Sequence, residues 1–173
     1  MLTPMPESRL APTLFIRNVM TTQLQVTQSL DSIDLQLVAQ YAKKLSDVGN
    51  AFNKIMAPTF IRDFIIGYDI ISVQLAKAIE TEIKAKSMLE TTEAIAYLDG
   101  APEFFKLRDE KPTVESRKAY VAMDQDVIRA KELYARSVAM VSLLKSKAIE
   151  FKAAIDCTRD LARDGYMTPH DNG

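Results

Sequence analysis

The chain has 173 residues, of which 47% are hydrophobic and 26% are charged, with a formal net charge of -1 and a pI near 5.9. This length fits one domain or one extended helical unit, and the near-neutral charge excludes a global attraction to nucleic acid or to an anionic membrane. Only 5 residues are glycine, whereas Ala, Lys, Glu, Ile and Leu are abundant. This composition favours helix over sheet.

Cysteine and histidine each occur once, as Cys157 and His170. A single cysteine permits no intramolecular disulfide, which fits a reducing compartment such as the cytoplasm, and we expect Cys157 to be a small buried side chain. A single histidine cannot build a zinc site or a histidine-based catalytic triad. Phosphate-binding glycine motifs and nucleophile motifs are also missing from the sequence. We therefore predict a non-enzymatic protein without metal, cofactor or small-molecule substrate.

The first segment, residues 1–30, is rich in proline at its start and has no apolar run of the kind that a signal peptide needs. Leu24 and Val26 alternate with polar residues, as in a short strand, but the same run could be an arm packed on a neighbouring molecule. We predict an extended or mobile arm here, a single helical domain over residues 31–165, and a mobile tail over residues 166–173.

Two helices are predicted after the arm, over about residues 31–56 and 59–98. Apolar residues recur at every third or fourth position, and Pro58 separates the two periodic segments. Asp99-Gly100 predicts the end of the second helix. The second helix holds the most apolar stretch of the chain, but charged residues interrupt it. A buried helix is therefore expected rather than a membrane span.

A third helix is predicted over about residues 113–163, with Thr113 as its N-cap, after a connector at residues 101–112. About 50 residues of helix would span about 75 Å, which is more than a chain of this size can cover along its whole length. We therefore expect a homo-oligomer. The positions that form the predicted core or oligomer seam of this helix are Tyr120, Val127, Tyr134, Val141, Leu144, Phe151 and Ile155. The predicted fold is all-α, a long antiparallel helical hairpin or bundle with heptad-like seams.

Two aspartates, Asp124 and Asp126, interrupt the third helical segment just after Met123. On a helix they would point about 200° apart, so they cannot share one proton or one metal ion. Two interpretations remain: both side chains are solvated, or Asp126 caps a new helix where the long helix kinks near Met123.

The connector contains the run EFFKLRDEK, which places aromatic rings beside cations. Aromatic side chains stack on bases and cations hold phosphates, so this composition suits sequence-tolerant binding of single-stranded nucleic acid. The candidate residues here are Phe104, Phe105, Lys106, Arg108 and Lys111. In the alternative interpretation, the two Phe residues only pin the connector onto the helical hairpin.

A wider pattern extends over about 70 residues between Ala96 and Gly165. Its parts are Tyr97-Leu98-Asp99-Gly100, Arg117, Tyr120-Val121, Asp124, Asp126-Val127, Tyr134, Ala154-Ile155-Asp156 and Arg159. This pattern resembles the UvsY-type recombination mediators of bacteriophages. The segment from Val38 to Ile55, with Gln40-Tyr41-Ala42, also looks like the first helix of that family.

The resemblance implies a ring-like oligomer that binds single-stranded DNA and loads a RecA-like recombinase, in the host cytoplasm if a phage encodes the chain. The family's basic pair falls on Thr92 and Ala94 here, so the resemblance moves the DNA site to other cations. The positions expected in its place are Lys84, Lys86, Lys106, Arg108 and Lys111. Two other hypotheses need no nucleic acid: a helical scaffold such as a virion assembly protein, and an inhibitor or adaptor that covers a partner's surface.

Overall fold

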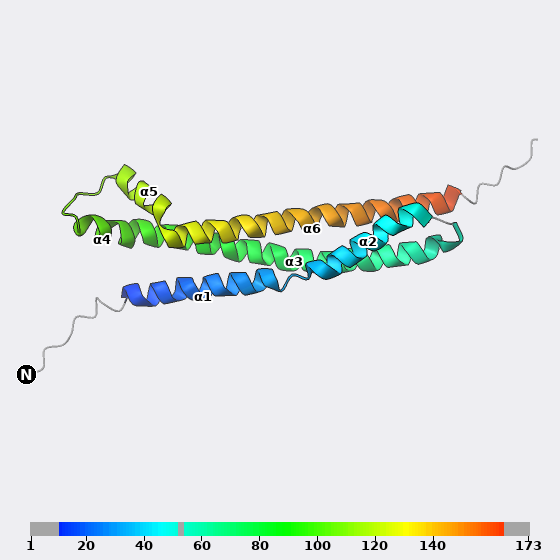
Figure 1. The fold of residues 1–173 in the computed structure, drawn as a ribbon, viewed down its shortest axis with the longest axis horizontal. Helices are drawn as coiled ribbons and strands as arrows, with labels where there is room; N and C mark the ends of the chain where they lie inside the picture. Colours follow the sequence, from blue (N-terminus) through cyan, green and yellow to red (C-terminus); the bar gives the residue numbers. More distant parts are fainter. Residues whose placement is uncertain (1–10, 52–53, 165–173) are drawn as a thin grey trace, which may run out of the picture. The chain divides into compact units, whose positions relative to one another are not determined.

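The computed structural model describes residues 11–51 and 54–164, and within these ranges the chain is helical and contains no strand (Figure 1). The all-α prediction is therefore confirmed. The helices are α1 (Ala11–Asp31), α2 (Leu35–Ala51), α3 (Ala57–Ile95), α4 (Ala101–Lys106), α5 (Val114–Met123) and α6 (Gln125–Asp164). A 3-10 turn (Lys54–Met56) precedes α3 and a π-helical turn (Ala96–Gly100) follows it. The predicted tail at residues 166–173 lies outside the described residues.

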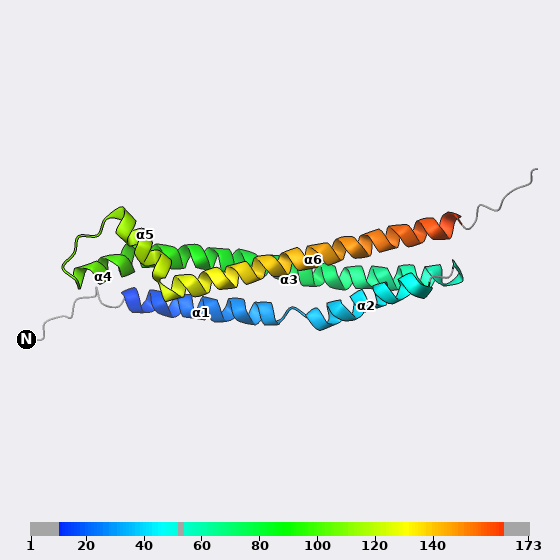
Figure 2. The ribbon, with the colours of Figure 1, turned by 45° about the horizontal axis from the view of Figure 1, so that its top comes forward.

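The contacts divide the chain into two compact units, each built from two distant segments. Unit 1 comprises Met1–Asp31 and Glu80–Val138, and unit 2 comprises Ser32–Ile79 and Ala139–Gly173. Within each unit, a part of α3 lies beside a part of α6 and runs antiparallel to it, as Figures 1 and 2 both show. No helix in the described ranges is long and apolar enough to cross a membrane.

The segment predicted to be an extended arm or strand is helical from Ala11 onward and forms α1. Val26 and Leu30, four residues apart and so one turn apart on a helix, are 0% and 2% exposed, whereas Leu24 is 59% exposed. The alternation of Leu24 and Val26 therefore does not mark a strand. Burial of one helical face decides the conformation of this polar segment, because tertiary packing overrides local propensity.

Unit 2 is centred on side chains from α3 and α6 that exclude water. Phe64, Ile71, Leu144 and Phe151 are buried, and the rings of Phe64 and Phe151 meet edge to face with 6.3 Å between centroids. The start of α2 is fixed onto α3 by a hydrogen bond of 3.1 Å from the backbone N–H of Asp34 to Oε1 of Gln74.

The predicted seam of the third helix is a core within one chain. Five of its positions are buried and the other two, Tyr120 and Tyr134, are partly buried. The buried positions are Val127, Val141, Leu144, Phe151 and Ile155. The chain's own helices thus cover the seam, so these positions alone do not require a second copy.

Cys157 is exposed, so the expectation of a buried thiol is wrong. The inner face of α6 falls instead on Ile155 and Thr158, which are both buried. Thr158 can occupy this position because its hydroxyl donates a hydrogen bond of 2.7 Å to the carbonyl oxygen of Ala154.

Gly67 lies where helices of unit 2 approach closely. A Cβ atom at this position would clash with Cε1 of Phe151 and would lie 3.1 Å from Cδ1 of Tyr41. Phe151 is fully buried, so its ring has no free space into which it could move. The glycine is therefore a packing requirement of the three neighbouring segments.

We predict that Gly67→Ala lowers the free energy of unfolding by about 1–3 kcal/mol, the usual cost of overpacking. In an uncrowded helix the same change would raise stability by up to about 1 kcal/mol. Urea unfolding of Gly67→Ala, Phe151→Leu and the double variant would measure this. We expect the double variant to be more stable than the sum of the single changes implies. Strict additivity would contradict the clash.

Candidate nucleic-acid interface

The predicted helix stop at Asp99-Gly100 is wrong, because the helix continues through the π-helical turn into α4. Gly100 has right-handed helical angles, with φ -65° and ψ -49°. Glycine is therefore not needed here for a left-handed turn. It leaves room for the side chain of Tyr120, because a Cβ atom at Gly100 would lie 3.1 Å from both Cε1 and the hydroxyl oxygen of Tyr120. Gly100 therefore lets α5 pack closely against the turn, and π-helical turns often mark functional sites.

Four aromatic side chains around this turn, which we call the aromatic cluster, engage one another or a cation: Tyr97, Phe104, Phe105 and Tyr120. The ring centroid of Phe104 lies 5.1 Å from that of Tyr120 and 5.2 Å from that of Phe105. The guanidinium of Arg108 lies 4.2 Å from the centroid of Phe104. Phe104 thus packs against Tyr120 of α5, which agrees with the alternative interpretation for one of the two Phe residues, and its ring also contacts a cation.

Tyr120 links this cluster to the end of α5. Burial raises the pKa of its phenol, and the nearby carboxylates of Asp124 and Glu103 raise it further. The phenol therefore remains protonated at physiological pH and presents a neutral hydroxyl beside Gly100.

Hydrogen bonds order the backbone at the end of α4. The N–H of Glu110 donates to the carbonyl of Phe105 (3.0 Å) and the N–H of Asp109 donates to that of Lys106 (3.2 Å), the pair of bonds that defines a Schellman motif. Asp109 adopts φ 55°, a left-handed conformation that Asp tolerates better than most residues. The backbone around Lys106 and Arg108 is thus ordered by its own hydrogen bonds.

The connector cations Lys106, Arg108 and Lys111 are exposed, and no carboxylate among the described residues lies within ion-pair distance of them. The other predicted cations differ: Lys84 is paired with Glu80 at 2.6 Å, and Lys86 is exposed on the same helix. About 30 Å of helix separates Lys86 from Lys106. The structure therefore does not bring the two predicted groups of cations together.

The two aspartates have separate roles. Asp124 is in an extended conformation and its Oδ1 accepts hydrogen bonds from the N–H groups of Asp126 (2.9 Å) and Val127 (3.1 Å). It is the N-cap of α6, so the predicted continuous third helix breaks into α5 and α6. The break near Met123 is thus confirmed, but Asp124 rather than Asp126 provides the cap. The predicted N-cap of α5, Thr113, is confirmed by a reciprocal capping box with Ser116.

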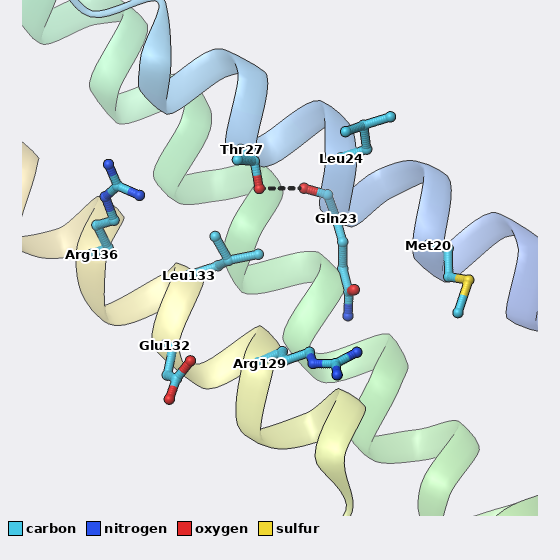
Figure 3. A pocket seen from close by; sticks show the side chains of 8 residues that line it. All are labelled: Met20, Gln23, Leu24, Thr27, Arg129, Glu132, Leu133 and Arg136. Carbon is cyan, nitrogen blue, oxygen red and sulfur yellow. Dashed lines mark hydrogen bonds between the residues drawn. The ribbon is translucent and has the colours of Figure 1, made fainter.

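An open groove between α1 and α6 in unit 1 is shown in Figure 3. Gln23 and Leu133 extend into this space, and Glu132 points away from it. Its cations already have carboxylate neighbours: Arg129 lies 3.6 Å from Asp126 and Arg136 lies 3.7 Å from Asp31. This groove is therefore a poorer anion site than the connector.

Tyr97 and Arg117 belong to the sequence pattern of the resemblance, but neither was among the predicted DNA-binding residues, and their contact was not predicted. The guanidinium of Arg117 lies 5.7 Å from the ring centroid of Tyr97, so α5 adds a cation to the aromatic cluster. Nothing in the local sequence signals this contact, because it depends on the break at Asp124. Among the described residues, no group of three or more acidic, histidine or cysteine side chains could hold a metal ion.

Comparison of the chain with protein-family models, with curated proteins and with solved structures gives no match.

We predict that Asp124→Ala lowers the free energy of unfolding by about 0.5–2 kcal/mol, because two N–H groups of α6 lose their acceptor. Asp126→Ala is the matched control. It removes only an exposed ion pair and a favourable charge near the helix N-terminus, so we expect a loss of about 0.5 kcal/mol. Chemical unfolding of both variants measures the difference, and equal losses would show that Asp124 is not the cap.

Proposed function

We propose that this chain is a non-enzymatic, oligomeric mediator that binds single-stranded DNA and helps to load a RecA-like recombinase. The observation that supports the proposal best is the set of exposed cations beside the aromatic cluster, Lys106, Arg108 and Lys111, which have no carboxylate within ion-pair distance among the described residues. Flexible cations can follow a phosphate backbone while flat groups contact bases, which is how sequence-tolerant single-strand sites work. The resemblance to UvsY-type mediators points to the same activity.

The charge balance of this region suits reversible binding. Five cations and five carboxylates occur between Ala96 and Met123, so the region has no net charge. Attraction to DNA would then come from short-range contacts rather than from a long-range field. A protein that hands a strand to another protein needs to release it, and modest affinity fits that task.

We predict that the double variant Lys106→Ala/Arg108→Ala binds labelled single-stranded oligonucleotides more weakly, whatever their sequence. Each lost phosphate contact reduces the slope of log affinity against log salt, so two lost contacts should reduce it by about 1.4. Fluorescence anisotropy over a salt series measures both quantities.

The matched control is Lys145→Ala/Lys152→Ala, which removes two exposed cations of α6 that likewise have no carboxylate within ion-pair distance among the described residues. This control variant changes the net charge by the same amount. We expect its slope of log affinity against log salt to equal that of the wild type. If the two double variants behave alike, the connector is not the DNA site. If wild-type protein does not bind at low salt, the proposed function is wrong.

An exposed apolar face of α3 in unit 2 supports self-association. Ile65, Ile66, Val73 and Ile79 lie on one side of the helix around Asp69, and Val73 is 56% exposed. Ser72 lies on the same side, and its hydroxyl donates a hydrogen bond to the carbonyl oxygen of Tyr68. This hydroxyl proton therefore does not need water as an acceptor. A helix that is apolar on its outer side as well as on its core side commonly has a further packing partner. This face also favours the second candidate, a helical scaffold without a nucleic-acid role.

We predict that Val73→Glu lowers the oligomer mass measured by light scattering, with little change in the unfolding of the chain, because Val73 is exposed in the single molecule. Ile149→Glu is the control, since Ile149 is 69% exposed on α6 and stands among polar or small neighbours. An unchanged mass for Val73→Glu would exclude this face. A large oligomer mass that does not change when DNA is added would favour the scaffold.

A further inference from the structure

A second open groove of unit 1, of about 460 Å³, lies beside the aromatic cluster. It is lined by Glu93, Ala94, Tyr97, Lys118, Val121, Ala122 and Lys131. These residues come from the end of α3, the π-helical turn, α5 and the start of α6. The groove therefore depends on the break at Asp124, which separates α5 from α6 and gives each helix its own direction (Figure 2). Its volume is within the range of small-ligand sites.

The lining has an apolar part and a cationic part. The ring of Tyr97, which is partly buried, lies with Val121 and two alanines, and the guanidinium of Arg117 lies 5.7 Å from that ring. A flat aromatic ligand could stack here, because aromatic rings and guanidinium planes are the two common stacking surfaces for bases.

The cationic part consists of Lys118 and Lys131. Lys118 is exposed and has no carboxylate within ion-pair distance among the described residues. Lys131 lies 3.1 Å from Glu93 and so compensates the only carboxylate of the lining. The groove therefore carries excess positive charge, unlike the groove between α1 and α6, where each arginine has its own carboxylate.

We propose that this groove takes one nucleotide of a bound single strand, with the base against Tyr97 and the phosphate held by Lys118. A nucleotide is the ligand class that combines a flat ring with an anion, as the lining requires. The proposal rests on the proposed function and adds a site to it. The connector cations hold the backbone, whereas this groove receives a base.

The test is anisotropy of a labelled oligothymidylate with three variants over a salt series. Tyr97→Leu removes stacking but no charge, so affinity should fall between about 5-fold and 150-fold with the salt slope unchanged. Lys118→Ala removes a phosphate contact, so the slope should fall by about 0.7. Tyr97→Phe keeps the ring and should bind like the wild type, while Lys145→Ala controls for the loss of one exposed cation.

The results distinguish a failure of the groove assignment from a failure of the proposed function. If the wild type binds and both Tyr97→Leu and Lys118→Ala bind equally well with unchanged slopes, the groove is not part of the site and the function stands. If the wild type does not bind at all, the function fails and the groove assignment fails with it. Complete displacement of the oligonucleotide by free thymidine monophosphate at the same nucleotide concentration would also overturn the assignment, because the groove would then be a site for free nucleotides.

Discussion

The N-cap at Asp124 is the interaction on which the rest of unit 1 depends. Two N–H groups at the start of α6 need an acceptor once the helix is broken, and the carboxylate of Asp124 provides it. Because the break is stabilised, the axis of α5 can take a different direction from that of α6. Tyr120 then reaches Gly100 and Phe104, and Arg117 reaches Tyr97. The aromatic cluster and the groove beside it therefore both follow from one capping carboxylate.

The packing of Tyr120 of α5 also depends on the π-helical turn that it faces. The π-helical turn carries the chain from α3 into α4 without interrupting the helix, and Gly100 leaves room for the Tyr120 ring. A Cβ atom at Gly100 would lie 3.1 Å from the Tyr120 ring, so the ring would have to shift by a few tenths of an ångström. Gly67 has the same role in unit 2, where it faces Phe151. In both units, close helix packing depends on a glycine inside a helix rather than on one that ends it.

Apolar periodicity predicted the buried face of α6 correctly, because burial follows the helical repeat directly: Val127, Leu144 and Phe151 are all buried. The predictions that failed concern residues whose structural role cannot be read from their neighbours in the sequence. Gly100 resembles a helix stop, yet its neighbour Tyr120 is 20 residues away in the sequence. Asp126 was the predicted cap, but Asp124 provides the cap because the helix breaks at that residue. Contacts between α5 and the π-helical turn could not be predicted until that break was placed.

Near-neutral composition does not argue against a local anion site, because carboxylates are distributed unevenly around the cations. Along α6, the exposed cations Arg129, Arg159 and Arg163 each have a carboxylate three residues away, which cancels much of their field at short range. Such exposed pairs contribute little to stability. Among the described residues, exposed lysines without a carboxylate within ion-pair distance include Lys106, Lys118, Lys145 and Lys152, and the first two belong to the elements that carry the aromatic cluster. In the proposed function, nucleic-acid contact would concentrate where α4, α5 and the π-helical turn meet.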